Sequence, residues 1–336
     1  MVGLSYVESF ARGYTRERVR DKWVYRTLRG KIVTAKHIID RLNAIALPPA
    51  YTDVWFCASA NGHIQAYGYD AKGRRQYRYH PAFLAQQDEA KYGRCLAFGH
   101  ALPAIRKQVE RDLARRDMSH VRIVAAIIRL LDLGKVRVGN RAYARQNKSF
   151  GATTLRNRHA KIEGKRILLD YVGKAGKIQR ISIEDRRLST VVRQCQEMPG
   201  QALFQYYDQD GDRHPVSSTD VNDYLREHSG GFTAKDFRTW GASVIAFGAL
   251  ARAKGDTSLK SLLVEVASQL GNTPAIARKS YVHPSIIEAA LAKDAPSDSW
   301  CLPRATKFLQ SGERGLIAFL EHYATPAAGD GLKPNL

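Results

Sequence analysis

The spacing of apolar residues changes once along the chain, near residue 80, and this change constrains the fold more than any other feature of the sequence. Before it come three short runs whose side chains alternate in character, Val54–Ala58, Ile64–Tyr69 and Arg75–Tyr79. Period-two alternation indicates β-strands, and the sequences between the runs, Asn61-Gly62 and Asp70-Ala71-Lys72-Gly73, are typical of tight turns. This part of the chain therefore predicts a small antiparallel meander.

After His80-Pro81 the apolar residues recur every three to four positions, which indicates amphipathic helices. The predicted helices are Pro81–Tyr92, Ala101–Arg116, His120–Leu133, Ser218–His228, Ala234–Arg252, Ser258–Leu270, Pro274–Tyr281, Pro284–Ala292 and Thr306–His322. Alternating runs interrupt them at Ala160–Glu163, Arg166–Val172 and Lys177–Ile183. We expect these runs to form a three-stranded β insertion, with Lys174 in a glycine-flanked turn.

The fold class expected from this order is α+β. A small antiparallel-sheet N-terminal lobe precedes a mainly α-helical lobe that carries the three-stranded insertion. We place the first lobe at residues 1–85, comprising a basic, mobile arm over residues 1–20, a helix at Thr34–Ala46 and the meander. The larger lobe covers residues 86–323, and residues 324–336 form a flexible tail with proline and glycine.

The charge of the chain points to a polyanionic partner. Lys and Arg number 53 against 32 Asp and Glu, which gives a formal net charge of +21. A membrane surface would also attract this charge, but no segment approaches the roughly 18 to 20 consecutive apolar residues of a membrane span. The first residues lack the apolar core of a signal peptide. We therefore expect a cytoplasmic protein that binds a polyanion and not a membrane.

Nothing in the sequence predicts a metal or a cofactor. The four cysteines, which lie far apart and form no CxxC pair, are Cys57, Cys95, Cys195 and Cys301, and we expect reduced, mostly buried thiols. The acidic run Asp208–Asp212 resembles a calcium loop, but its glycine comes too early and no Glu closes it, so a solvated turn is favoured. The glycine-rich run Val172–Lys177 lacks the phosphate-loop spacing.

Four further segments combine into one pattern. They are Lys135–Asn140, Tyr171–Lys174, Lys235–Trp240 and Leu270–Pro284, the last of which contains Gly271-Asn272-Thr273-Pro274 and Lys279-Ser280-Tyr281. In this order the set resembles the type IB DNA topoisomerases, in particular their compact poxvirus-like and bacterial branch. The resemblance extends over nearly the whole chain and includes the N-terminal stretches Leu47–Trp55 and Gly68–Tyr77.

The resemblance implies a site for phosphoryl transfer to a tyrosine. Arg137 and Arg238 match the two arginines that contact the scissile phosphate, and planar guanidinium groups suit that task. Asn272 stands where many relatives have a histidine, and its amide can still donate a hydrogen bond. Lys174 matches the general acid that protonates the leaving oxygen, and Tyr281 matches the nucleophile.

Each of these residues alone has a more ordinary interpretation. An arginine in a basic protein is usually a solvated charge, and a lysine in a glycine-rich turn is usually a turn residue. A tyrosine near a helix end is usually a half-buried packing residue. The joint pattern in this order favours the catalytic assignment over the separate interpretations.

Further residues are candidates for contact with DNA. For each of them the sequence favours a DNA contact and an ordinary surface or core position equally. In the meander they are Gln65, Tyr67, Tyr69, Lys72, Arg74 and Tyr77, on a face that also carries Tyr79. In the larger lobe they are Tyr143, Lys148 and Lys235, with Arg156 and Arg158 as further charges that neutralise the DNA backbone.

The resemblance implies a monomer whose two lobes close as a clamp around duplex DNA, with a nucleoid-associated location. The implied reaction is nicking through a 3′-phosphotyrosine, rotation and religation, which relaxes supercoils of either sign without ATP or metal. A tyrosine recombinase or integrase is the closest alternative, but such enzymes usually carry His three residues before the second arginine, where this chain has Lys235. A DNA-binding protein without enzymatic activity would explain the charge alone.

Overall fold

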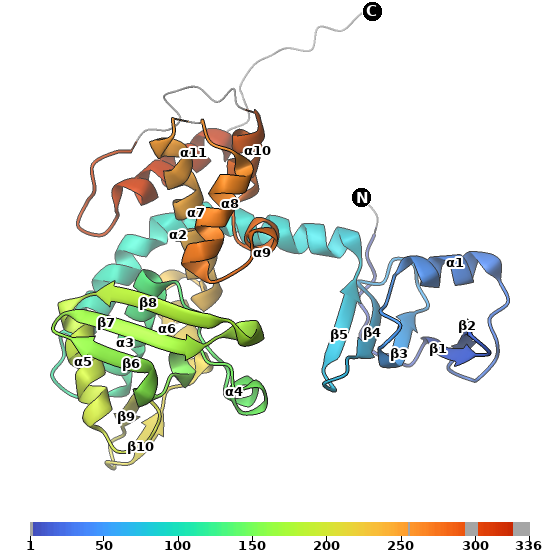
Figure 1. Cartoon of the computed structure of the whole chain (residues 1–336), viewed down its shortest axis with the longest axis horizontal. Helices are drawn as coiled ribbons and strands as arrows, with labels where there is room; N and C mark the ends of the chain where they lie inside the picture. Colours follow the sequence, from blue (N-terminus) through green and yellow to red (C-terminus); the bar gives the residue numbers. More distant parts are fainter. Residues whose placement is uncertain (1–2, 255, 293–301, 325–336) are drawn as a thin grey trace, which may run out of the picture. The chain divides into compact units, whose positions relative to one another are not determined.

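The computed structural model describes residues 3–254, 256–292 and 302–324. The chain divides into two compact units, Met1–Lys91 and Tyr92–Leu336, whose elements are shown in Figure 1. Helix α2, Pro81–Leu113, contains the boundary between them. Each unit has its own buried apolar core.

The first unit is a five-stranded antiparallel sheet with helix α1 and the beginning of α2. Its strands have the order β2-β1-β3-β4-β5. Their bounds are Gly13–Val19 for β1, Lys22–Thr27 for β2, Thr52–Cys57 for β3, Ile64–Tyr69 for β4 and Arg75–Tyr79 for β5. Helix α1, Lys36–Ala44, lies inside the predicted helix range. The predicted meander is present as β3, β4 and β5.

The prediction of a mobile arm over residues 1–20 is wrong. Strand β1 pairs with β2 from Tyr14 to Val19 and with β3 at Gly13 and Tyr14. The connection at Arg20-Asp21 has positive φ at both residues, 45° and 64°, which matches the twist of a two-residue hairpin. The hairpin was missed because this turn lacks glycine and asparagine, and because charged residues carry the alternation in β1.

The two faces of this sheet bury different side chains. One face packs a core of Tyr25, Leu42, Leu47, Val54, Phe56 and Ala66, in which Leu42 comes from α1. The other face buries Trp55, with the ring of Tyr67 stacked on it at 5.6 Å between centroids. The guanidinium of Arg75 lies 3.7 Å from the centroid of Tyr67. The aromatic face is therefore capped by a cation, an arrangement that stabilises aromatic faces.

The second unit is mainly helical. The two helices predicted between Pro81 and Arg116 are one continuous helix, α2, with Pro103 inside it. The other helices are α3 His120–Gly134, α4 Arg141–Asn147, α5 Arg186–Glu197, α6 Ser218–Ser229, α7 Ala234–Arg252, α8 Leu259–Leu270, α9 Pro274–Ser280, α10 Pro284–Ala292 and α11 Ser311–Ala324 (Figure 1). Helix α7 is buried on nearly all sides from Phe237 to Ala251, which makes it the central helix of this core.

Among its described residues, this unit also has two small sheets and three short 3₁₀ turns. The predicted insertion is the antiparallel sheet β6-β7-β8, formed by Ala160–Glu163, Arg166–Val172 and Ile178–Glu184. The 3₁₀ turns are Ala152–Thr154, Asn157–His159 and Lys174–Gly176. A second sheet pairs β9, Gln205–Tyr207, with β10, Arg213–Pro215. Helices α4 and α5 and this second sheet were not predicted; α4 has no buried residue and thus no apolar stripe.

The acidic run after β9 forms a hydrogen-bonded turn. Oδ1 of Asp208 accepts the backbone N–H of Asp210 at 3.1 Å and of Asp212 at 2.8 Å. Over the described parts of the chain, no group of three or more His, Cys, Asp or Glu residues is placed to hold a metal ion. In the same parts, no helix has the length and apolar character needed to cross a membrane. Cys57, Cys95 and Cys195 are buried, and Cys301 lies outside the described residues.

Candidate active site

Four of the five predicted catalytic residues lie together, although they come from separate parts of the second unit. Arg137 follows α3, Arg238 lies in the second turn of α7, and Asn272 lies between α8 and α9. Nη2 of Arg137 donates to Oδ1 of Asn272 at 2.8 Å and lies 3.5 Å from Oη of Tyr281. The guanidinium of Arg238 lies 5.0 Å from the centroid of the Tyr281 ring. One phenol is thus next to two guanidinium groups.

Arg238 is held in place by backbone carbonyl groups. Its side chain is buried, with 4% exposed. Nη1 donates to the carbonyl oxygen of Lys135, and Nη2 donates to that of Leu270 at 3.1 Å. Lys135 has a positive φ of 51° as the residue that ends α3. Burial and the charge of Arg137 lower the pKa of Arg238, but a guanidinium stays protonated at neutral pH. The site therefore contains a fixed, buried positive charge.

Tyr281 ends α9, and its phenol is half-buried beside this charge. Burial alone would raise the pKa of the phenol, but the charges of Arg238 and Arg137 outweigh burial, so that the pKa lies below its usual value of 10.0. A lower pKa means a larger fraction of phenolate at neutral pH. Because phenolate is the nucleophilic form of a tyrosine, this environment favours the form that could attack an electrophile.

Asn272 presents a hydrogen-bond donor that nothing in the described chain satisfies. Its Oδ1 accepts from Arg137, and its Nδ2 is buried without a partner in those residues. The residue is fixed from both sides, because Gly271 ends α8 with φ +63° and Thr273 caps α9. An unsatisfied buried donor costs about 1–3 kcal/mol. Such a cost is expected at a site where a ligand supplies the acceptor.

Lys174 lies at the tip of the β7–β8 hairpin and is exposed. The turn is closed by the N–H of Gly173, which donates to the carbonyl of Lys177 at 2.7 Å. In the described chain, no hydrogen bond or ion pair joins the Lys174 ammonium to the other four residues. The structure therefore brings four of the five predicted residues together and leaves the fifth at the surface.

Two residues near the site were missed at the sequence level. Tyr171 is buried on β7, and burial raises the pKa of its phenol to about 12. The charges of Arg238 and Arg137 lower this pKa, but burial outweighs them. Lys135 was quoted only as part of a motif, yet its carbonyl positions Arg238. The signal for Tyr171 was its place in an alternating strand three residues before Lys174. For Lys135 the contact joins residues 103 positions apart, and no local pattern reveals it.

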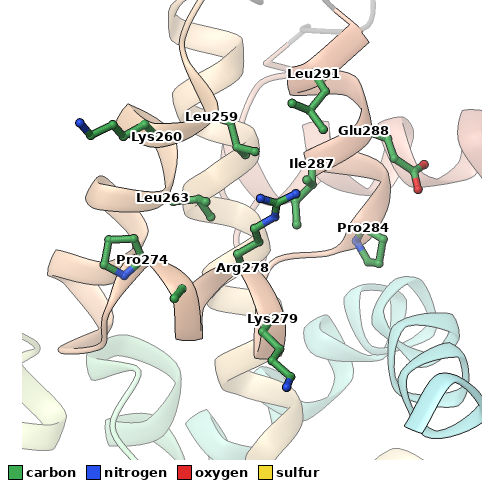
Figure 2. A pocket seen from close by; sticks show the side chains of 11 residues that line it. Leu259, Lys260, Leu263, Pro274, Arg278, Lys279, Pro284, Ile287, Glu288 and Leu291 are labelled. Carbon is green, nitrogen blue, oxygen red and sulfur yellow. The ribbon is translucent and has the colours of Figure 1, made fainter. Parts of the chain in front are cut away.

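A surface hollow lies beside α9, on a side that contains none of the five residues. Figure 2 shows Arg278 and Lys279 extending from α9, with Leu259, Leu263 and Ile287 among the apolar residues of the hollow. Its lining includes neither Arg137, Arg238 nor Tyr281. The hollow therefore belongs to the outside of the helix that leads to Tyr281, and the candidate active site is separate from it.

The residues predicted as DNA contacts in the first unit fall into two groups. Lys72 is exposed, Tyr77 is 38% exposed, and Tyr67 and Tyr69 are partly exposed. Gln65 is buried, and its Nε2 donates to the carbonyl of Gly62 at 2.7 Å and of Ala60 at 3.0 Å. Arg74 is ion-paired with Asp70 at 2.7 Å. Gln65 and Arg74 thus have partners within the protein, whereas Lys72 and Tyr77 face solvent.

The corresponding residues of the second unit are exposed, except for Arg156, which is partly buried. Tyr143 lies on α4 with 40% of its surface exposed, Lys148 follows that helix, and Lys235 lies in the first turn of α7. Nη1 of Arg156 donates to Oε1 of Gln201 at 3.1 Å, and Arg158 is exposed. Lys235 precedes Arg238 by about one helical turn, so both residues lie near the N-terminal end of α7.

Comparison with protein families gives two matches. Residues 77–294 match the family described as eukaryotic DNA topoisomerase I, catalytic core. Residues 22–70 match the family described as bacterial DNA topoisomerase IB, N-terminal domain. The first match contains all four clustered residues and Lys174, and the second contains α1 and most of the sheet.

Individual relatives agree with these matches. DNA topoisomerase 1B of Acanthamoeba polyphaga mimivirus is 32% identical over 83% of this chain and 88% of its own length. DNA topoisomerase 1B of vaccinia virus is 21% identical over 68% of this chain and 72% of its own. Among solved structures, the XerH site-specific recombinase bound to a palindromic difH substrate covers 55% of this chain and 50% of its own, with 16% identity and a TM-score of 0.35. A structural likeness at that level supports no argument about function.

Proposed function

Because this chain belongs to the type IB DNA topoisomerases, we propose that it relaxes positively and negatively supercoiled duplex DNA by nicking one strand, allowing rotation and resealing the nick. The proposal depends on one observation above all: the phenol of Tyr281 lies next to the guanidinium groups of Arg137 and Arg238. A tyrosine activated in this way is suited to attack a phosphodiester, which is the substrate of the family.

In the proposed cleavage step, the phenolate oxygen of Tyr281 attacks the phosphorus of one backbone linkage. A bond forms between Oη and phosphorus, and the bond between phosphorus and the 5′-oxygen breaks. The departing 5′-oxygen takes a proton from the Lys174 ammonium. The products are therefore a 3′-phosphotyrosine and a 5′-hydroxyl. Religation is the reverse of this step. Because the phosphotyrosine retains the energy of the broken bond, the reaction needs no ATP.

Charge that develops on the non-bridging oxygens is stabilised in this proposal by Arg137, Arg238 and Asn272. Fixed donors aimed at such oxygens are the main catalytic device in phosphoryl transfer. Arg238 is fixed by two carbonyl groups, and the unsatisfied Nδ2 of Asn272 can donate to a phosphate oxygen. We propose that these groups supply the positive charge and hydrogen bonds for which other phosphoryl transferases use a metal ion.

DNA binding in this proposal uses charge on both units. The net charge of +21 favours a polyanion, and binding to phosphates releases counterions. We propose that exposed Lys72, Tyr77, Tyr143, Lys148 and Lys235 contact the duplex, and that a monomer closes its two lobes around it as a clamp. Gln65 and Arg74 would first have to give up the internal partners described above, so we expect a smaller contribution from them.

Recombination is the alternative outcome of the same chemistry. Two observations favour the topoisomerase: Lys235 stands three residues before Arg238, where recombinases usually carry His, and residues 22–70 match the bacterial topoisomerase IB N-terminal domain. The deciding experiment incubates supercoiled plasmid with the protein in EDTA without nucleotide. We expect full relaxation of either sign of supercoil and no exchange between plasmids. A strict need for magnesium or ATP would contradict the mechanism, and exchange between two sites would identify a recombinase.

A further inference from the structure

Gln179 is a buried polar side chain at the base of the β7–β8 hairpin. It is 8% exposed and lies on β8 directly across from Tyr171 on β7. Its Nε2 makes a long hydrogen bond of 3.4 Å to the carbonyl of Ile178, its own neighbour in the chain, and this is its side-chain hydrogen bond within the described residues. Hydrogen bonding within the described residues therefore gives little reason for a glutamine at this position. The packing contacts of the side chain give a better one.

The two ends of this side chain touch two glycines that precede residues of the site. A Cβ atom built on Gly173 would lie 2.9 Å from Cγ of Gln179, and Gly173 immediately precedes Lys174. A Cβ atom built on Gly271 would lie 2.3 Å from Oε1 and 2.4 Å from Nε2 of Gln179, and Gly271 immediately precedes Asn272. Real Cβ atoms essentially never lie so close to other atoms, so a larger residue at either glycine would have to push the Gln179 side chain aside.

Among the described residues, no hydrogen bond or ion pair joins the side chains of Lys174 and Asn272, and Gln179 contacts the glycine that precedes each of them. The hairpin carries Lys174, the candidate proton donor, and the α8–α9 turn carries Asn272, the candidate oxyanion donor. Because Gln179 lies between Gly173 and Gly271, its length sets the distance between the two backbones. A shorter side chain would leave a gap there, and the hairpin tip would lose its fixed distance from the turn.

We propose that Gln179 is a positioning residue that fixes the Lys174 hairpin against the Gly271-Asn272 turn, and so aligns the proton donor with the phosphate held by the arginines. This inference rests on the proposed topoisomerase function. Gln179 itself touches neither the phosphate nor the leaving oxygen, and its effect on the reaction passes through the position of Lys174. A displacement of about 1 Å in such a group can reduce a rate by roughly 100-fold.

The test uses a duplex with the bridging 5′-oxygen replaced by sulfur at one cleavage site that has been mapped with the wild-type protein. A thiolate leaves without a proton, so a variant whose defect lies in proton delivery recovers on this strand. We expect Gln179→Ala to cleave the normal strand roughly 10- to 100-fold more slowly than wild type. On the sulfur-substituted strand it should cleave at nearly the wild-type rate.

Two variants control this experiment. Gln179→Met keeps the length of the side chain without its amide, so it should retain most of the activity if the spacing between the two glycines is what matters. Ser182→Ala changes an exposed residue of the same strand and should behave like wild type on both substrates. Thermal melting of each variant verifies that it is folded before rates are compared.

A second experiment tests the contact with Gly173 directly. Gly173 has φ −92°, which any residue adopts, so the damage from Gly173→Ala comes from its new Cβ against Gln179 and not from backbone strain. We expect Gly173→Ala to slow cleavage of the normal strand. In the Gln179→Ala background the same change should add little, because the group it collides with has gone.

The outcomes separate this inference from the proposed function. If Lys174→Ala is rescued by sulfur but Gln179→Ala is equally slow on both strands, Gln179 does not act through the proton donor and the inference is wrong. Wild-type rates for Gln179→Ala on the normal strand would also overturn it. If wild-type protein forms no covalent adduct on either strand, the proposed function itself fails.

Discussion

Arg238 and Lys174 occupy opposite kinds of environment, although both are cations proposed to act on the same phosphodiester. Arg238 is 4% exposed and donates to two backbone carbonyl groups, whereas Lys174 is exposed at a hairpin tip. A group that stabilises developing charge gains from being fixed before the substrate arrives, because no reorganisation is then needed during the reaction. A proton donor must reach the leaving oxygen, so it can be presented by a separate element.

Under the proposed mechanism, this difference divides the site into a preorganised part and a delivered part. The preorganised part consists of Arg137, Arg238, Asn272 and Tyr281, which already contact one another. The delivered part is the β7–β8 hairpin with Lys174. Substitutions in the first part should impair the reaction whatever the leaving group is, and substitutions in the second should impair it only when the leaving group needs a proton.

The largest expected effect comes from Tyr281→Phe. Removing the hydroxyl deletes the nucleophile but hardly alters the charge that binds DNA, so covalent capture should vanish while binding stays nearly intact. Denaturing gels measure the adduct and gel-shift titration measures the binding. Tyr171→Phe is the matched control, because its phenol also lies near both arginines but has a raised pKa. An adduct that persists in Tyr281→Phe would assign the nucleophile to another tyrosine.

The next effect in size is that of Lys174→Ala on the normal strand. Loss of a general acid typically costs roughly 10²- to 10⁴-fold, and we expect a reduction of this order in the single-turnover cleavage rate. With a bridging 5′-sulfur the variant should cleave about as fast as wild type. A variant that stays slow on the sulfur-substituted strand would contradict the division, and Lys235 would become the next candidate for the proton donor.

Asn272 tests the preorganised part at a position where this chain departs from many relatives. Asn272→Ala removes the free Nδ2 donor and should slow cleavage by roughly 10²-fold or more, the scale for one oxyanion donor. Asn272→His keeps a donor and should retain most of the activity. Cleavage rates on the normal strand measure both variants, and neither should gain from sulfur. Equal and severe losses in both would mean that Asn272 serves packing and the Arg137 contact.

The smallest effect is expected outside the active site, at Lys72. If this exposed side chain contacts one phosphate, Lys72→Ala should weaken DNA binding modestly and reduce the slope of log K against log salt by about one unit. The cleavage step itself should be unchanged once DNA is saturating. Lys260→Ala removes the same charge from the hollow beside α9 and should leave the slope nearly as it is. Identical slopes in wild type and Lys72→Ala would remove Lys72 from the proposed DNA contacts.

The sequence predicted the family and most helices and strands because the features behind them are local. Periodicity placed β4 at Ile64–Tyr69 and α7 at Ala234–Arg252, and ordered motifs identified Arg137, Arg238 and Tyr281 as one set. The N-terminal hairpin was missed, since charged residues carry its alternation and its turn, Arg20-Asp21, has no glycine. Helix α4 was missed because it buries no apolar residue.

What the sequence could not reveal are contacts between distant residues. The carbonyl of Lys135 accepts from Arg238 because α3 ends in a left-handed residue, and Gln179 reaches Gly271 because β8 passes the end of α8. These contacts depend on the rotamers of Arg238 and Gln179 and on the left-handed backbone at Lys135. The packing of the folded core determines all three. The sequence also could not show that Nδ2 of Asn272 lacks a partner among the described residues. That depends on the contact of Arg137 with Oδ1 of the same amide.

Locating the covalent bond tests the central claim most directly. Protein would be incubated with a duplex carrying a bridging 5′-sulfur at the cleavage site, so that the released thiol cannot reseal the strand and the adduct accumulates. Digestion with protease and nuclease, followed by mass spectrometry, identifies the tyrosine that carries the nucleotide. The account predicts a single phosphotyrosyl linkage at Tyr281, and a linkage at Tyr171, Tyr143 or any other tyrosine would contradict it.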